Sequence, residues 1–171
     1  KSFQEHSAAK TVHHGFAGGL LEHTLSVVKF CDYMVGAYPI LNKDLLFTAA
    51  ICHDIGKTKI PEEILNAPRR LTEEEFEIIK AHPVYSYELL WDNVDEDIRL
   101  AARHHHERLD GKGYPDQIAG DEISLLARIT AISDVYDAMI SQRSYKESMI
   151  PFDVLEKFKK GEFPGLDERL V

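Results

Sequence analysis

The chain has 171 residues, a length that fits one domain with a single sizeable core. Its formal net charge of −9 at pH 7 argues against a broad surface for duplex nucleic acid or membranes, because binding to polyanions relies on clustered Lys and Arg. No segment has the length and apolarity of a signal peptide or a membrane span, so we expect a cytoplasmic domain without direct membrane insertion.

The ends and the cysteines indicate the wider context. The chain starts at Lys1 and stops at Val171, which is typical of a fragment, so we expect residues 1–171 to be one domain of a longer protein. A fused sensor or receiver domain would then lie outside the fragment. Cys31 and Cys52 lie in apolar helical runs, which argues against a disulfide framework and favours a reducing cytosol.

Apolar residues recur at three- and four-residue spacing along almost the whole chain, which predicts an all-α bundle. The first expected helix runs from Leu20 to about Tyr38. The second lies in "NKDLLFTAAICHDIGK", with Asn42 as its N-cap and Gly56 as its C′ residue.

A third helix is expected in "LTEEEFEIIKAH", where Thr72 and Glu75 fit a capping box. Pro83 ends this helix and places His82 at a junction between helices. The remaining expected helices are 95–106, 125–140 and a short one in "FDVLEKFKK", with "DGKGYPD" as a loop.

The histidines gather at the ends of these expected helices. "HHHERLDGKGYP" places three in a row where a helix ends, and successive side chains on a helix point about 100° apart. Neighbouring histidines can therefore share one target only where the backbone is free to bend. This stretch predicts half of a metal site, and His23, His82 and the pair His53-Asp54 are candidates for the rest.

Asp134 also indicates a metal site, since it lies in the apolar run "LLARITAISDVYDAMI". A carboxylate on such a helix face costs several kcal/mol unless it is paired or bound to a metal. Proteins build two-metal sites in helical bundles from several helices, each of which contributes one or two such groups to the core. Mixed imidazole and carboxylate donors suit Fe, Mn or Zn better than Mg or Ca.

Several long motifs occur in an order that resembles the HD-GYP phosphodiesterases, a branch of the HD-domain metal-dependent phosphohydrolases that hydrolyse cyclic di-GMP. They are "HDIGK", "IPEEILNAPRRLTEEEFEIIKAHP", "HHERLDGKGYPD" and "ISDVYDAMISQRSYK". The resemblance covers about residues 51–146 and implies an HD-type helical bundle with a two-metal site in its core.

The resemblance implies a ligand set for each metal. One metal would be held by His23, His53, Asp54 and Asp134, and the other by Asp54, His82, His105 and His106. Asp54 would bridge the two, while His104 would not be a ligand. Fe and Mn are the metals that we expect, with Zn, Ni and Co as alternatives.

The resemblance implies hydrolysis of cyclic di-GMP to pGpG, GMP or both, and paired cations would support it through a metal-bridged hydroxide that attacks the phosphodiester. Lys57, Arg143 and Lys146 are the basic residues expected to hold the phosphates. In "DGKGYPD", Gly111 and Gly113 are expected to supply turns with positive φ. The Gly113-Tyr114-Pro115 segment is expected to line the substrate groove.

The first fifty residues resemble a different branch. "AAKTVHHGFAGGLLEHTLSV" looks more like the HD domain of bacterial 3′-to-5′ exoribonucleases, although both groups place a metal-binding histidine at the position of His23. A phosphohydrolase acting on RNA 3′ ends or another nucleotide is therefore one alternative, and a catalytically silent nucleotide-binding signalling module is another. A homodimer is the one assembly that we consider.

The number of metals follows from the same resemblance. Some HD-GYP proteins bind a third metal through a Glu one helical turn before the histidine, and this chain has Gly19 there. Glu22 directly precedes His23 and points about 100° away around a helix, so it does not replace that ligand. We expect two metals.

Overall fold

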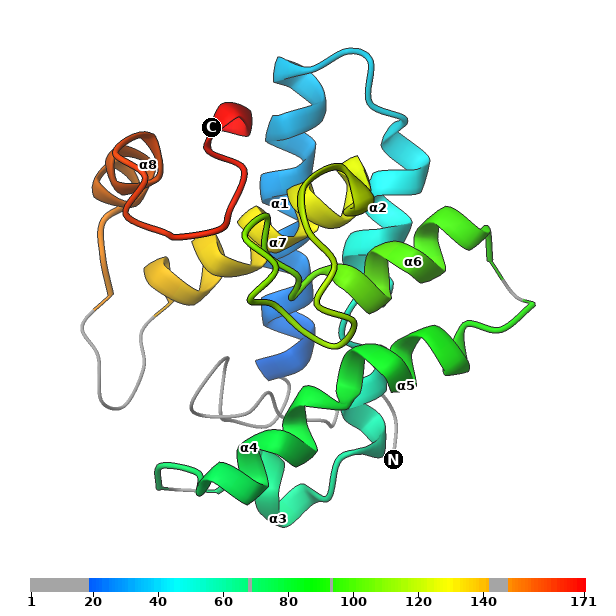
Figure 1. Ribbon diagram of the computed structural model, residues 1–171. Coiled ribbons are helices and arrows are strands. Elements are labelled where there is room, and N and C mark those ends of the chain that lie inside the picture. Colours follow the sequence, from blue (N-terminus) through cyan, green and yellow to red (C-terminus); the bar gives the residue numbers. More distant parts are fainter. Residues whose placement is uncertain (1–18, 68, 93, 142–147) are drawn as a thin grey trace.

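The computed structural model describes residues 19–67, 69–92, 94–141 and 148–171, and every regular element within these ranges is helical. The α-helices are α1 Gly19–Ala37, α2 Lys43–Cys52, α3 Glu62–Leu65, α4 Glu73–Lys80, α5 His82–Leu89, α6 Glu96–His104, α7 Leu125–Ile140 and α8 Pro151–Lys159 (Figure 1). Short 3₁₀ helices lie at η2 Ile55–Lys59, η3 Gly120–Glu122 and η4 Glu168–Leu170. The predicted all-α class is confirmed.

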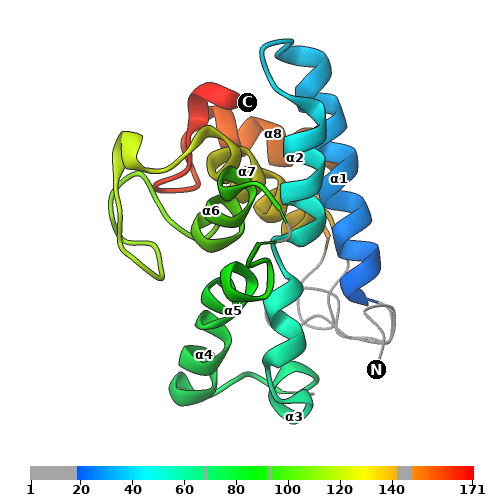
Figure 2. The same ribbon diagram turned by 90° about the vertical axis from the view of Figure 1, so that its right-hand side faces the viewer.

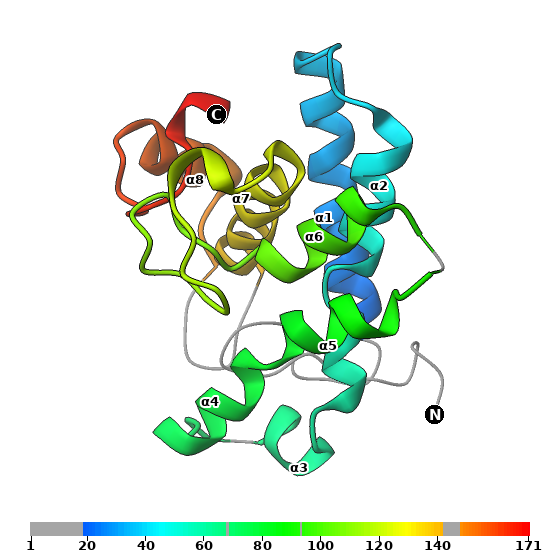
Figure 3. The same ribbon diagram turned by 45° about the vertical axis from the view of Figure 1, so that its right-hand side comes forward.

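The helices pack around α1, α2, α6 and α7. Helix α1 contacts α2 and α7, and α6 contacts α2, α5 and α7. Figures 1 and 2 show α3 and α4 at one end of the molecule and α8 at the other. Helices α5 and α6 are neighbours that run in opposite directions (Figure 3), so the start of α5 lies near the end of α6.

The helix boundaries follow local signals in the sequence. The Asn42 side chain accepts hydrogen bonds from the backbone of Asp44 and Leu45, which confirms it as the N-cap of α2. Thr72 and Glu75 form the predicted capping box of α4. Helix α4 ends at Lys80 and α5 begins at His82, so the predicted junction at this histidine is confirmed.

The largest apolar core lies between α1, α2, α7 and α8. It is made of Val27, Phe30, Cys31, Met34, Leu46, Ala50, Ile129, Ile132, Val154 and Phe158. Each large aliphatic or aromatic side chain buried in this way contributes about 1.5–3 kcal/mol relative to exposure. A smaller core of Ile60, Leu65 and Ile79 joins η2, α3 and α4. The two cores fix helices from both halves of the chain around the polar groups described below.

Cys31 and Cys52 are free thiols. Among the described residues, no helix combines the length and the apolarity needed to cross a membrane.

Candidate metal centre

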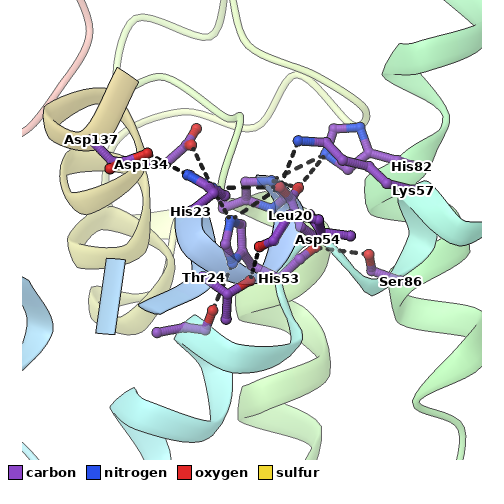
Figure 4. A network of polar contacts seen from close by, with 12 residues as sticks. Leu20, His23, Thr24, His53, Asp54, Lys57, His82, Ser86, Asp134 and Asp137 are labelled. Atoms are coloured by element: carbon purple, nitrogen blue, oxygen red, sulfur yellow. Dashed lines mark hydrogen bonds and ion pairs between the residues drawn. The ribbon is translucent and has the colours of Figure 1, made fainter. Parts of the chain in front are cut away.

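One cluster of donor atoms lies between α1, the end of α2 and α7 (Figure 4). His23 Nε2 is 3.2 Å from His53 Nε2, 3.4 Å from Asp134 Oδ1 and 3.5 Å from Asp54 Oδ2. His53 Nε2 is also 3.5 Å from Asp54 Oδ2. These four side chains are buried, so a ligand enclosed by them would be shielded from bulk water.

A second cluster lies between the start of α5 and the end of α6. His82 Nε2 is 3.3 Å from His105 Nε2 and 3.2 Å from Asp54 Oδ1, and His105 Nε2 is 3.7 Å from Asp54 Oδ1. His106 completes the group, since one donor atom from each of the three histidines lies within 4.8 Å of the others. All seven predicted metal ligands therefore come together in two adjacent clusters.

Asp54 is shared by both clusters through different oxygens. Its Oδ2 atom faces the imidazoles of His23 and His53, and its Oδ1 atom faces those of His82 and His105. A carboxylate in this orientation can bind one cation on each side. The arrangement is the one expected for a bridging ligand.

Three of the histidines are oriented by backbone carbonyls three residues earlier. The Nδ1–H groups of His53, His82 and His105 donate to the carbonyls of Ala50, Ile79 and Ala102, over 2.7, 2.7 and 2.8 Å. Each acceptor belongs to the last turn of a helix, where carbonyls have no intrahelical partner. Because a carbonyl can only accept, Nδ1 carries the proton and Nε2 presents a lone pair to the cluster.

His23 lies inside α1, where no helix-end carbonyl is available to it. Its Nδ1 contacts Asp137 Oδ2 at 2.6 Å instead. Sequence reasoning missed Asp137, which lies on α7 three residues after Asp134 and therefore on the same helix face. A second buried acid at this spacing in an apolar helix was the signal that could have identified it.

Burial keeps several of these imidazoles neutral. Desolvation lowers the pKa of His53 below that of a free imidazole. It lowers the pKa values of His105 and His106 well below that value, and neighbouring imidazoles add to the effect. The neutral imidazole is the form that binds a metal, so protons compete weakly for these sites near pH 7.

Lys57 is fully buried beside the Asp54 carboxylate. Its Nζ atom donates to Asp54 Oδ2 over 2.5 Å. A buried ammonium without a counter-charge would be costly, so this contact fixes the lysine at the edge of the clusters. Its predicted nearness to the reaction site agrees with this position, while its contact with phosphate stays a prediction.

Gly56 allows η2 to approach α5 closely, which corrects the expectation that it is a helix C′ residue. It lies within η2, and a Cβ atom there would be 2.0 Å from the His82 carbonyl oxygen and 2.5 Å from Ser86 N. Ser86 Oγ accepts from Gly56 N and donates to the His53 carbonyl, both over 2.8 Å. This contact, which sequence reasoning missed, ties the two clusters together.

The loop after α6 folds back over the second cluster. The Tyr114 ring stacks on His106, with centroids 4.7 Å apart and planes 22° apart. Gly111 has the predicted positive φ of 73°, whereas Gly113 does not have a positive φ, which corrects that prediction. A Cβ atom at Gly113 would lie 2.3 Å from Glu107 Cα, so this glycine is required by close packing.

The other predicted residues have different outcomes. His104 is not in either cluster and contacts Asp116 Oδ2 at 2.9 Å, as expected for a non-ligand. Tyr114 and Pro115 are joined by a cis peptide bond and are partly buried, while their contact with substrate stays a prediction. Arg143 and Lys146 lie outside the described residues. Helix α7 does end at Ile140, as expected.

The donor set fits divalent metal ions. His23 Nε2 and His53 Nε2 face one another at 3.2 Å, although both rings use Nδ1–H as the donor to other groups. Two lone pairs so close together repel unless a cation lies between them. His106 Nε2 is buried and has no hydrogen-bond partner among the described residues. Imidazole nitrogens with carboxylate oxygens are ligands for borderline transition metals.

Comparison with known proteins adds a family relationship. A family model described as HD domain matches residues 20–162. One relative is the cyclic di-GMP phosphodiesterase response regulator RpfG of Xanthomonas campestris pv. campestris. It is 48% identical to this chain over 103 residues, which cover 58% of this chain and 27% of the relative. Another relative is the 3′3′-cGAMP-specific phosphodiesterase 2 of Vibrio cholerae. It is 33% identical to this chain over 154 residues, which cover 87% of this chain and 30% of the relative. The chain thus spans less than a third of the length of these relatives.

Solved structures share the fold. An HDG"Y"P protein from Bdellovibrio bacteriovorus matches with a TM-score of 0.67 and 16% identity, over 86% of this chain and 48% of that one. The HD domain of the phosphodiesterase PgpH from L. monocytogenes, in complex with cyclic-di-AMP, matches with a TM-score of 0.60 and 22% identity, over 87% of this chain and 84% of that one.

Proposed function

This chain belongs to the HD domain family, and on that premise we propose that it hydrolyses a phosphodiester bond of a cyclic dinucleotide, cyclic di-GMP first, with two divalent metal ions. The names of the relatives support this substrate class, since they act on cyclic di-GMP and 3′3′-cGAMP. The products would be pGpG, GMP or both.

The position of Asp54 carries the proposal. One metal would be held by His23, His53, Asp54 and Asp134, and the other by Asp54, His82, His105 and His106. Each oxygen of the Asp54 carboxylate faces a different cluster, which supports a pair of metals that share one ligand. Two such ions would supply an activated water at neutral pH and charge that offsets the phosphate.

The protein groups supply position and charge. The imidazoles of His23, His53, His82 and His105 are fixed by their Nδ1 contacts, so their Nε2 atoms need no reorganisation when a ligand binds. The Lys57 ammonium lies at the bridging carboxylate and would bind a phosphate oxygen placed there. Arg143 and Lys146 are proposed to hold the more distant phosphate.

The finer identity of the centre and its setting belong to the same proposal. The donors favour Fe or Mn, with Zn, Ni and Co as alternatives. We place the domain in the cytoplasm, in a longer signalling protein whose sensor or receiver domain would control it, and we consider a homodimer compatible with this role.

A substrate panel tests the proposal. The protein, treated with chelator and reloaded with Mn²⁺ or Fe²⁺, is incubated with cyclic di-GMP, 3′3′-cGAMP, cyclic-di-AMP and a short RNA with a free 3′ end, and the products are separated by chromatography. We expect cleavage of a cyclic dinucleotide by the wild-type chain and by Asp153→Asn, an exposed change on α8, and none by Asp54→Asn. Shortening of the RNA alone would instead support the exoribonuclease-like alternative.

A further inference from the structure

His106 differs from the other histidines of the centre in how its ring is held. His23, His53, His82 and His105 each direct Nδ1 to a carboxylate or a helix-end carbonyl at 2.6–2.8 Å. The rings of His82 and His105, which belong to the same cluster, pack on His106 with centroid distances of 5.0 and 4.1 Å. Tyr114 lies outside the cluster, and its ring is stacked nearly parallel to that of His106, with a centroid distance of 4.7 Å. The orientation of His106 therefore has another source.

The Tyr114 ring is well placed to supply that orientation. Its plane is tilted by only 22° from the plane of His106, so the two rings share a broad contact face. The backbone N–H of Tyr114 donates to the His106 carbonyl over 3.3 Å. Lys80 Nζ lies 5.8 Å from the Tyr114 ring centroid. The tyrosine is thus fixed relative to the histidine through both backbone and ring.

Glu107 holds the loop that carries this tyrosine. Its side chain is buried, and Oε1 accepts hydrogen bonds from the backbone N–H groups of Asp116 and Gln117, over 2.6 and 3.0 Å. Both donors follow Tyr114 closely in the chain. A charge-assisted bond of this kind in a buried setting is stronger than a neutral one. Gly113 packs directly on the Glu107 backbone, which tightens the same turn.

We propose that Tyr114 is a positioning residue that orients His106 for metal binding, and that Glu107 acts through Tyr114 by holding the loop closed. The stacked ring limits rotation of the His106 side chain before the metal binds, so less conformational entropy is lost on binding. This inference rests on the proposed metal centre but not on the identity of the substrate.

Metal binding to the chelated protein provides the test. Titration with Mn²⁺ alone, followed by calorimetry, measures each site without any substrate. We expect Tyr114→Leu to weaken one of the two sites by about 10–100-fold, the usual effect of losing an outer partner of a ligand, and to leave the other unchanged. Tyr114→Phe keeps the ring and should keep both affinities. Tyr38→Leu, a partly buried tyrosine packed on the large core, is the matched control.

A double substitution tests the link from Glu107 to Tyr114. Glu107→Ala should weaken the same site, and Glu107→Gln should retain binding because its amide oxygen still accepts from the loop. The double variant Glu107→Ala/Tyr114→Leu should bind no more weakly than Tyr114→Leu, since both changes remove one orienting contact. Circular dichroism checks that each variant is folded, and the Gln variant remains informative where the Ala variant is not.

Two results would overturn the inference. Wild-type affinity at both sites in folded Tyr114→Leu would remove Tyr114 from the orientation of His106, and additive losses in the double variant would show that Glu107 acts by another route. Both results concern metal affinity, so they are distinct from a failure of the proposed function, in which metal binds normally and no cyclic dinucleotide is cleaved.

Discussion

The two ligand clusters share Asp54 but are built in different ways. The first takes His23 and Asp134 from within α1 and α7, helices that also form the largest apolar core. The second takes its three histidines from the start of α5 and from the chain just after α6. Helix packing therefore fixes His23 and Asp134 in the first cluster, where only His53 lies at a helix end, whereas helix ends and one loop fix the second.

The difference explains which partners the histidines use. A histidine at a helix end can use a free carbonyl of the last turn, as His82 and His105 do. A histidine inside a helix has no such carbonyl, so His23 uses the carboxylate of Asp137. The orientation of His23 in the first cluster thus depends on a contact between distant helices, whereas His53, His82 and His105 depend on local backbone geometry.

Removing Asp54 should have the largest effect, because this residue contributes a carboxylate oxygen to each of the two clusters. We expect Asp54→Ala to lower activity by more than about 100-fold, beyond the loss typical of outer contacts, and to weaken metal binding at both positions. Metal analysis together with circular dichroism measures this. A folded variant that holds two metals and turns over normally would show that Asp54 is not the bridge.

Asp137→Asn should affect the first cluster alone. The amide cannot reproduce the charged acceptor at His23 Nδ1, so Mn²⁺ affinity at one position should fall by about 10–100-fold while the other stays unchanged. Calorimetric titration of the chelated protein distinguishes the two. Equal losses at both positions would mean that the clusters are coupled more tightly than their separate construction implies.

Gly56→Ala should disturb the contact between the two clusters. A Cβ atom there would lie 2.0 Å from the His82 carbonyl, so η2 and α5 must move apart, at a cost of about 1–3 kcal/mol in the free energy of unfolding. Gly36→Ala in α1 is the control, since nothing lies within 4 Å of its Cβ position. Denaturant unfolding compares them, and equal stability of both variants would exclude this role for Gly56.

The smallest effect concerns the pH dependence of stability and the histidines of the second cluster. Desolvation lowers the pKa values of His105 and His106 in the folded chain, so the unfolded chain binds more protons once the pH falls below about 6.5. The metal-free protein should therefore lose stability as the pH falls through this range. Thermal unfolding between about pH 7.5 and 5.5 measures the loss. A double His105→Gln/His106→Gln variant should show a flatter dependence, and an equally steep one would assign the effect to other groups.

The sequence by itself determined the all-α class, most helix ends and which residues are candidates for metal binding. Periodicity, the caps at Asn42 and Thr72, and Pro83 act over a few residues, so they can be recognised without a fold. The relationship to HD-domain phosphohydrolases was also correctly predicted, because several motifs recur in order. The resemblance of the first fifty residues to exoribonucleases stays a prediction.

Only the tertiary structure decided how these residues cooperate. The contact of His23 with Asp137 joins residues 114 positions apart, and the space that excludes a side chain at Gly56 is made by α5. Likewise, Gly113 was expected to provide a positive φ but is required by packing against Glu107. Such contacts depend on which surfaces meet after the helices pack. Local sequence patterns carry no information about contacts between residues that are far apart in the chain.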